Sequence, residues 1–177
     1  MDFLKKLYKK KTPFDYILYS AIILGGILLD QLTKWLSVEF LTRITTFPLI
    51  KGVLHLTYVE NTGAAFGMLK DHRWVFIVTS TLAILALIAY LYLGHASSRL
   101  QAIAFSMIIS GGIGNMIDRT VLGFVVDFID FRLINFAVFN GADSFICVGA
   151  GLMILDILLE LKREVALAKE NKERKEK

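Results

Sequence analysis

Residues 74–98 read WVFIVTSTLAILALIAYLYLGHASS and contain no Lys, Arg, Asp or Glu. An uncharged apolar stretch of about 20 residues or more is long enough to cross the hydrocarbon core of a bilayer as a helix. This stretch therefore predicts a transmembrane helix and decides the fold class.

Three further apolar runs flank this stretch and predict three more spans. The first starts at residue 16 and continues to Trp35, and the others cover residues 100–117 and 144–161. The composition agrees, because 55% of the 177 residues are hydrophobic and only 20% are charged, against roughly 45–50% and about 25% in soluble domains. We expect an all-α membrane protein with four transmembrane helices in residues 1–162 and a charged cytoplasmic tail in residues 163–177.

Two longer connections separate the predicted spans. The first, residues 38–72, contains VLHLTYV at 53–59, whose β-branched and aromatic residues predict a strand and hence a small β element. The second, residues 120–139, is unusually apolar for a connection and predicts a loop or helix that rests in the membrane interface.

The distribution of basic residues predicts the orientation. The N-terminal tail holds five Lys, and the chain from residue 162 to the C-terminus holds seven Lys or Arg. Positively charged segments tend to stay in the cytoplasm, so both termini are expected there and both long connections outside. The net charge of +4 is thereby explained by orientation, and nucleic acid is not expected as a partner.

Several kinds of chemistry are disfavoured by the residues available. The single Cys147 cannot form an intramolecular disulfide and lacks an activating cation, and His55, His72 and His95 are scattered over both sides of the membrane. No metal site, no cofactor, and neither serine nor cysteine catalysis are therefore predicted.

The aspartates are the best candidates for chemistry, because a carboxylate near hydrocarbon is costly and is usually functional. With both termini inside, five of them are expected near the outer face, whereas Asp156 falls roughly 20 Å deeper than Asp143 and is interpreted as a snorkelling interfacial residue outside the site. Two adjacent carboxylates can share one proton, so that one activates water and the other polarises a carbonyl. The five outer aspartates are Asp30, Asp118, Asp127, Asp130 and Asp143, and the polar residues at the same level are Asn61, Asn115, Arg119 and Asn140.

Five short motifs together resemble the successive motifs of lipoprotein signal peptidase, or signal peptidase II, in order and spacing over about residues 16 to 160. The resemblance implies a bacterial inner-membrane aspartyl endopeptidase with an extracytoplasmic site. Its substrates would be diacylglyceryl-modified prolipoproteins, cleaved N-terminal to the lipidated cysteine. The motifs are DQLTK (30–34), NTGAAFG (61–67), GNMIDR (114–119), VVDF (125–128) and FNGADS (139–144).

Carried over motif by motif, the resemblance implies a role for each candidate residue. Asp127 and Asp143 would be the catalytic pair. Asn61 and Arg119 would hold the substrate backbone, Asn115 and Asn140 would orient the pair and its water, and Gly63 would support the site as a turn or packing residue. Asp30 and Lys34 would form a partly buried supporting ion pair, with Asp118 as a salt-bridge partner or third candidate for catalysis. Partners would be the prolipoprotein signal peptides and membrane lipid, with the enzyme a monomer.

Two alternatives belong to other classes. A small proton-coupled transporter or channel would need acids distributed through the depth of the bilayer, or inverted repeats, and the sequence shows neither. An intramembrane protease of the presenilin type would carry its acid in a Gly-x-Gly-Asp setting within a span, which is absent from the sequence.

Overall fold

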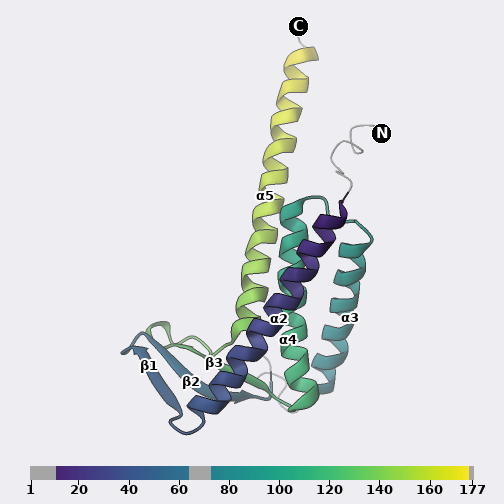
Figure 1. Cartoon of the computed structure of the whole chain (residues 1–177). Helices are drawn as coiled ribbons and strands as arrows, with labels where there is room; N and C mark the ends of the chain where they lie inside the picture. Colours follow the sequence, from purple (N-terminus) through teal and green to yellow (C-terminus); the bar gives the residue numbers. More distant parts are fainter. Residues whose placement is uncertain (1–10, 64–72, 176–177) are drawn as a thin grey trace.

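Within residues 11–63 and 73–175, the part of the chain that the computed structural model describes, four α-helices run side by side and a small sheet lies at one end of the bundle (Figure 1). Both termini lie at the opposite end, where α5 continues well past the other helices. In chain order the elements are α2 (Pro13–Leu41), β1 (Thr46–Ile50), β2 (Leu54–Asn61), α3 (Arg73–Tyr92), α4 (Arg99–Val121), β3 (Val125–Phe131), the 3₁₀-helix η2 (Arg132–Ile134) and α5 (Gly141–Lys175).

Three of the helices, α2, α4 and α5, are long and apolar enough to cross a membrane by length and composition. The described part of α3 adds a shorter apolar segment, Ile77–Tyr92. Large apolar side chains such as Leu28 on α2 and Ile157 on α5 stay exposed on the outer surface of the bundle, as suits a helix that faces lipid. The chain is therefore mainly helical with membrane-like helices and a small sheet, as expected.

Side-chain caps fix where the helices begin. The hydroxyl of Thr12 accepts a hydrogen bond from the backbone N–H of Asp15, whose carboxylate accepts from the N–H of Thr12 at 2.9 Å, so a capping box starts α2. At the start of α4, the N–H of Gln101 donates to the Oγ of Ser98 at 2.9 Å. These caps satisfy backbone donors that helices otherwise leave without a partner.

Helix α4 packs against α2, α3 and α5, and its small residues permit the closest of these approaches. A Cβ atom built on Gly111 would collide with the backbone oxygen of Ala142 at the start of α5. One built on Gly114 would meet the carboxylate of Asp30 on α2. The absence of side chains at these two positions therefore brings the first turn of α5 and the middle of α2 together.

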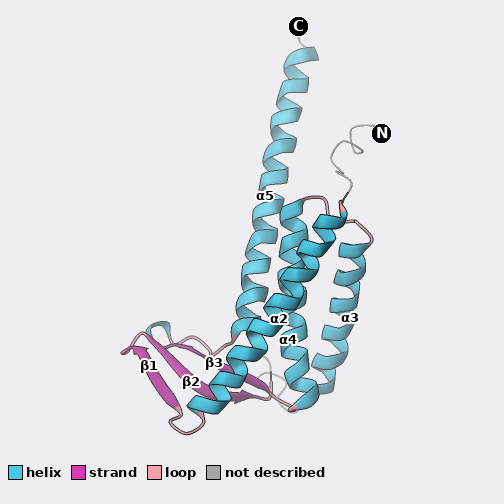
Figure 2. Ribbon diagram, viewed as in Figure 1, coloured by secondary structure: helices cyan, strands magenta, loops and turns pink. Residues whose placement is uncertain are grey.

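The sheet is antiparallel in the order β1-β2-β3, so the strand expected at residues 53–59 is present as β2, the central strand (Figure 2). Residues 120–139, in contrast, were expected to form a loop or helix, and the structure has the strand β3 there over Val125–Phe131. After α4 ends at Val121, the one helical segment in this described connection is the three-residue η2. Most of β3 is buried on both faces, so its sequence lacks the polar–apolar alternation that identifies a half-buried strand.

Candidate active site

Asp127 lies in the middle of β3 and is 2% exposed. Each of its carboxylate oxygens accepts a hydrogen bond from an asparagine amide. Asn61, at the end of β2, donates to Oδ2 at 2.9 Å, and Asn140 donates to Oδ1 at 2.7 Å. The pairing of β2 with β3 therefore brings the predicted Asn61 against the predicted Asp127.

Asp143 lies in the first turn of α5, where Asn140 caps the helix. The N–H of Asp143 donates to the side-chain oxygen of Asn140 at 3.0 Å, and the N–H of Asn140 donates to Oδ2 of Asp143 at 3.2 Å. This reciprocal arrangement is a capping box with Asp in place of the usual Glu. Its effect is to hold the Asp143 side chain at the positive end of the helix dipole, where a carboxylate is favoured.

Two asparagines link the carboxylates to each other. The amide of Asn140 that donates to Asp127 lies 3.0 Å from the side-chain oxygen of Asn115, and the amide nitrogen of Asn115 donates to Oδ1 of Asp143 at 2.7 Å. Asn140 is fully buried and Asn115 is 7% exposed. Because an amide has a fixed donor end and a fixed acceptor end, this chain defines how both carboxylates are oriented.

Behind the asparagines, a buried ion cluster joins α2 to α4. The ammonium group of Lys34 lies 2.9 Å from Asp30 and 3.0 Å from Asp118, and it donates to the side-chain oxygen of Asn115 at 3.0 Å. Gln31 donates to the other oxygen of Asp118 at 3.0 Å. The expected ion pair between Asp30 and Lys34 is therefore present, and Asp118 pairs with the same Lys34.

The same cluster anchors the backbone next to each candidate catalytic residue. The N–H of Ala142, which precedes Asp143, donates to Asp30 at 2.7 Å. The N–H of Val126, which precedes Asp127, donates to Asp118 at 3.1 Å. Asp30 and Asp118 therefore hold the two segments in place and do not face the cavity described next.

A cavity of about 850 Å³ opens beside the two carboxylates. One wall is apolar and includes Phe136, Phe139 and Val148. Arg119 reaches the opening from α4 and donates to the backbone oxygens of Asn115 and Gly63 at 3.4 Å each. The predicted site residues that line the cavity are Asn61, Gly63, Asn115, Arg119, Asp127 and Asp143, and the other polar residues in its lining are Glu60, Thr62 and Ser144.

Asp127 is the carboxylate of the pair whose protonation is visibly perturbed. Burial raises the pKa of Asp127 to about 6, and the negative charge of Asp143 acts in the same direction. The hydrogen bonds from Asn61 and Asn140 oppose this rise because they stabilise the ionised form. A carboxyl group with this pKa can hold or release a proton near neutral pH.

Asp130, three residues after Asp127, does not join this arrangement. Residues three apart on a strand point to opposite faces, and Asp130 pairs with Arg132 at 2.8 Å and accepts from Thr57 at 2.7 Å. Although burial acts to raise the pKa of Asp130, the hydrogen bonds from Arg132 and Thr57 lower it below the ordinary value. Asp130 is thereby a structural carboxylate of the sheet.

The sequence interpretation missed part of the site, and one part of its prediction lies outside the described residues. Gln31, which donates to Asp118, belongs to the DQLTK motif but was assigned no role. The sequence feature that could have indicated a role is its polar amide, next to Asp30 within an apolar run. The apolar wall from Phe136 to Phe139 carried no chemical signal. Residues 64–67 of the NTGAAFG motif fall outside the described ranges, as do residues 1–10 of the basic N-terminal tail.

Among the described residues, no group of three or more His, Cys, Asp or Glu side chains is placed to hold a metal ion. The chemistry that the described groups offer is acid–base: Asp127 and Asp143 lie at one cavity, amides orient both carboxylates, and the pKa of Asp127 is raised.

Comparisons with known proteins agree over most of the chain. A family model described as signal peptidase (SPase) II matches residues 22–159. A lipoprotein signal peptidase of Brevibacillus brevis is 44% identical over 149 residues, which are 84% of this chain and 97% of that protein. Another, of Microcystis aeruginosa, is 48% identical over 148 residues, 81% of this chain and 90% of that protein.

Solved structures show the same fold. A bacterial membrane enzyme determined by the in meso method at 2.3 Å resolution has a TM-score of 0.74 and 29% sequence identity, covering 82% of this chain and 90% of that one. A second, at 1.9 Å resolution, has a TM-score of 0.72 and 32% identity, covering 85% and 97%. The matched segment, residues 22–159, contains both carboxylates of the cavity.

Proposed function

The chain belongs to the signal peptidase II family, and on this premise we propose that Asp127 and Asp143 together activate one water molecule to cleave lipoprotein signal peptides. The protein is a protease and a multi-pass protein of the bacterial inner membrane. Family membership favours the peptidase over the transporter or channel considered from the sequence. The observation that carries the mechanism is the hydrogen-bonded chain from Asp127 through Asn140 and Asn115 to Asp143, beside one cavity.

The two carboxylates have different roles in this mechanism. Asp127, with its pKa raised to about 6, holds the proton that the pair shares. Asp143 is ionised and accepts a proton from the water molecule as its oxygen attacks the scissile carbonyl carbon. Asp127 simultaneously donates its proton to the carbonyl oxygen, which gives a neutral tetrahedral diol. Collapse of the diol returns a proton to Asp127, transfers the proton on Asp143 to the leaving nitrogen, and breaks the carbon–nitrogen bond.

Asn115 and Asn140 are positioning residues. Neither needs to touch the substrate, because each already donates to a carboxylate oxygen and fixes the direction of that carboxylate. Lys34 supports them in turn through the side-chain oxygen of Asn115. A pair oriented before the substrate binds loses little free energy to reorganisation during the reaction.

The remaining cavity suits a lipid-modified peptide. A guanidinium group has several donors in a fixed geometry, which suits the alignment of a peptide, so Arg119, Asn61 and Gly63 would hold the substrate backbone. The apolar wall that includes Phe136 and Phe139 would receive the acyl chains of the modified cysteine. Cleavage would then occur N-terminal to that cysteine.

The proposed membrane arrangement has four spans, α2, α3, α4 and α5, with both termini in the cytoplasm and the cavity at the extracytoplasmic face. It rests on the basic tails and on the position of the sheet at the end of the bundle opposite both termini (Figure 1). Residues 1–162 would be the peptidase domain of a monomer, residues 163–177 a cytoplasmic tail, and the surrounding lipid a partner.

Substitution of each carboxylate tests the mechanism. Asp127→Asn and Asp143→Asn should each lower the cleavage rate of a diacylglyceryl-modified prolipoprotein by at least about a thousandfold, since each variant lacks an acid–base group of the reaction. Asp130→Asn is the matched control on the same strand and should stay within a few-fold of the parent. Parent-like cleavage by either of the first two variants would overturn the mechanism.

A further inference from the structure

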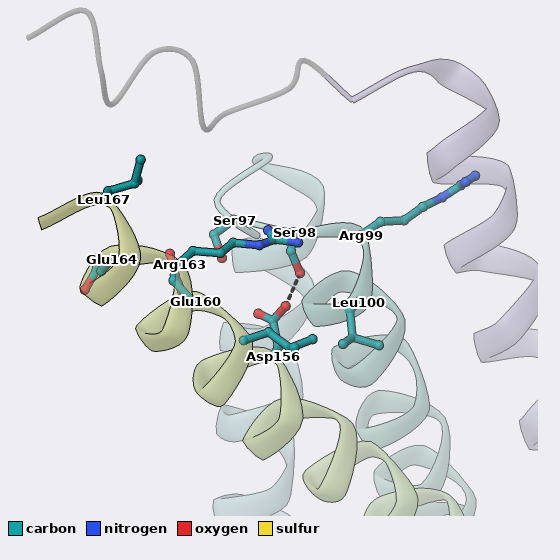
Figure 3. Close-up of a pocket in the computed structure, with 10 residues that line it drawn as sticks. Ser97, Ser98, Arg99, Leu100, Asp156, Glu160, Arg163, Glu164 and Leu167 are labelled. Atoms are coloured by element: carbon teal, nitrogen blue, oxygen red, sulfur yellow. Dashed lines mark hydrogen bonds between the residues drawn. The ribbon is translucent and has the colours of Figure 1, made fainter. Parts of the chain in front are cut away.

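A second pocket, of about 350 Å³, lies at the other end of the bundle, between the start of α4 and the middle of α5 (Figure 3). Its deepest polar group is Asp156, and Ser98, Arg163 and Glu160 also line it. The pocket is on the side of both chain termini, away from Asp127 and Asp143, and the proposed cleavage reaction does not use it.

Asp156 does not extend to solvent as the sequence interpretation expected. It is 6% exposed, and only one of its oxygens has a partner, the hydroxyl of Ser98, which donates to Oδ1. Its other oxygen, Oδ2, is buried and accepts no hydrogen bond from any described residue. A buried acceptor without a donor is unfavourable, so a ligand that supplies a donor there would bind favourably.

Around Asp156 the pocket carries charges of both signs, because Arg163, Glu160 and Glu164 line it. Figure 3 shows the side chain of Arg163 extending across the pocket above Asp156, toward Ser98. No ion pair joins Arg163 to Asp156 within residues 11–63 and 73–175. Arg99 points away and pairs with Asp15 of α2 at 3.2 Å. An anionic group that enters the pocket would be attracted to Arg163.

A ligand complementary to this pocket carries an ammonium group that binds the buried carboxylate of Asp156 and a phosphate group that binds Arg163. Membrane phospholipids with a primary amine have both groups, joined by a short linker. The pocket is also edged by Leu100, Leu159 and Leu167. Leu155, Leu158 and Leu159 on α5 are exposed beside the pocket, where acyl chains could lie.

We propose that this pocket binds the head group of phosphatidylethanolamine from the membrane leaflet at the end of the bundle where both termini lie. The ammonium group donates to Oδ2 of Asp156, the phosphate lies against Arg163, and the acyl chains follow the exposed leucines of α5. Because a trimethylated ammonium has no N–H to donate, the site distinguishes phosphatidylethanolamine from phosphatidylcholine.

Native mass spectrometry of the whole protein in detergent, titrated with the two lipids carrying identical acyl chains, tests the proposal. Phosphatidylethanolamine should bind roughly tenfold more tightly than phosphatidylcholine, the factor expected for one hydrogen bond to a buried charge. Equal affinities would overturn the proposal.

Two variants separate the two halves of the site. Asp156→Asn should abolish the preference for phosphatidylethanolamine, whereas Arg163→Gln should weaken both lipids and leave their ratio unchanged, because both lipids carry the phosphate. Glu170→Gln, an exposed carboxylate on the same helix paired with Arg174 at 2.8 Å, is the matched control and should bind as the parent does. Circular dichroism checks that each variant is folded. Because Arg163 is on the surface, Arg163→Gln still tests the proposal if Asp156→Asn does not fold.

A competition experiment identifies the source of the head group. Soluble phosphoethanolamine, added in the same concentration range as the lipid, should not displace it, since the free compound lacks the acyl chains that contact α5. Displacement at comparable concentrations, or a preference that persists in folded Asp156→Asn, would overturn the proposal of a lipid site.

Discussion

At the scale of single residues, two asparagines control the protonation of Asp127. Asn61 and Asn140 each donate to one of its oxygens, at 2.9 and 2.7 Å, and both donations lower a pKa that burial raises to about 6. The pKa of Asp127 is therefore a balance between burial and these hydrogen bonds, and the loss of either donor must raise it further.

We predict that Asn61→Ala shifts the alkaline limb of the pH–rate profile upward by about one pH unit, since about 1.4 kcal/mol corresponds to one unit. In the proposed mechanism Asp127 must keep its proton, so the rate of the parent falls as pH rises through about 6. A higher pKa keeps the proton to higher pH. The measurement is kcat/KM for prolipoprotein cleavage across the pH range.

Two results would contradict this assignment. A limb that moves to lower pH in Asn61→Ala would mean that Asn61 stabilises the protonated form, and a parent rate that rises steadily with pH would mean that no shared proton is required. Asn171→Ala, an exposed asparagine near the end of α5, is the matched control and should leave the limb unchanged.

At the scale of elements, one buried ammonium group holds α2 and α4 together. Lys34 is paired with both Asp30 and Asp118, and the side chains of all three residues are 4% exposed or less. Lys34→Met would leave two buried carboxylates without their cation, and such a loss costs about 3–5 kcal/mol.

We therefore predict a large fall in the thermal unfolding midpoint of Lys34→Met in detergent. Partial recovery is expected in Lys34→Met/Asp118→Asn, because the double variant has one buried charge fewer. Lys169→Met, on the exposed surface of α5, should unfold as the parent does. Equal midpoints for Lys34→Met and Lys169→Met would show that the cluster contributes nothing to stability.

The approach of α4 to α5 sets the position of Asp143. A Cβ atom at Gly111 would overlap the backbone oxygen of Ala142, and backbone cannot rotate away as a side chain can. We predict that Gly111→Ala displaces the first turn of α5 and lowers cleavage at least about tenfold, given the sensitivity of catalysis to small misplacements.

Gly151→Ala is the matched control, because a Cβ atom there would have nothing within 4 Å. Alanine is the better helix former, so this variant should be as stable as the parent or slightly more stable. A fully active Gly111→Ala would show that the first turn of α5 tolerates movement.

The elements also show what a sequence can and cannot predict. The four helices and β2 were predictable because each has length, apolarity or strand-forming residues of its own. β1 was not, since Pro48 removes a ladder hydrogen bond and confines the strand to an edge. β3 was not, because burial on both faces removes the alternating pattern.

The candidate site, like the fold, was predictable from the sequence only in part. The motifs brought together Asp127, Asp143 and their asparagines, but the connection of Asp30 and Asp118 to the backbone of Ala142 and Val126 joins residues up to 112 positions apart. No local pattern encodes such contacts. These hydrogen bonds exist because packing of the helices brings the distant residues together.

At the scale of the whole molecule, the two ends of the bundle differ in chemistry. The carboxylates of the proposed catalytic pair and the sheet occupy one end, and the termini, with the pocket around Asp156, occupy the other (Figure 1). In the proposed arrangement the cavity faces outward, toward a substrate that has crossed the membrane, and the basic tails lie in the cytoplasm.

This arrangement predicts opposite labelling of two introduced cysteines. In a Cys147→Ser background without native thiols, Lys51→Cys lies in the turn between β1 and β2, and Glu173→Cys lies near the end of α5. A membrane-impermeant maleimide should label Lys51→Cys in intact spheroplasts and label Glu173→Cys only after permeabilisation. The background protein should stay unlabelled in both conditions. If both positions react in intact cells, or if the pattern is reversed, the cavity and the basic tails cannot face the proposed sides, because the sheet and the C-terminus lie at opposite ends of one bundle.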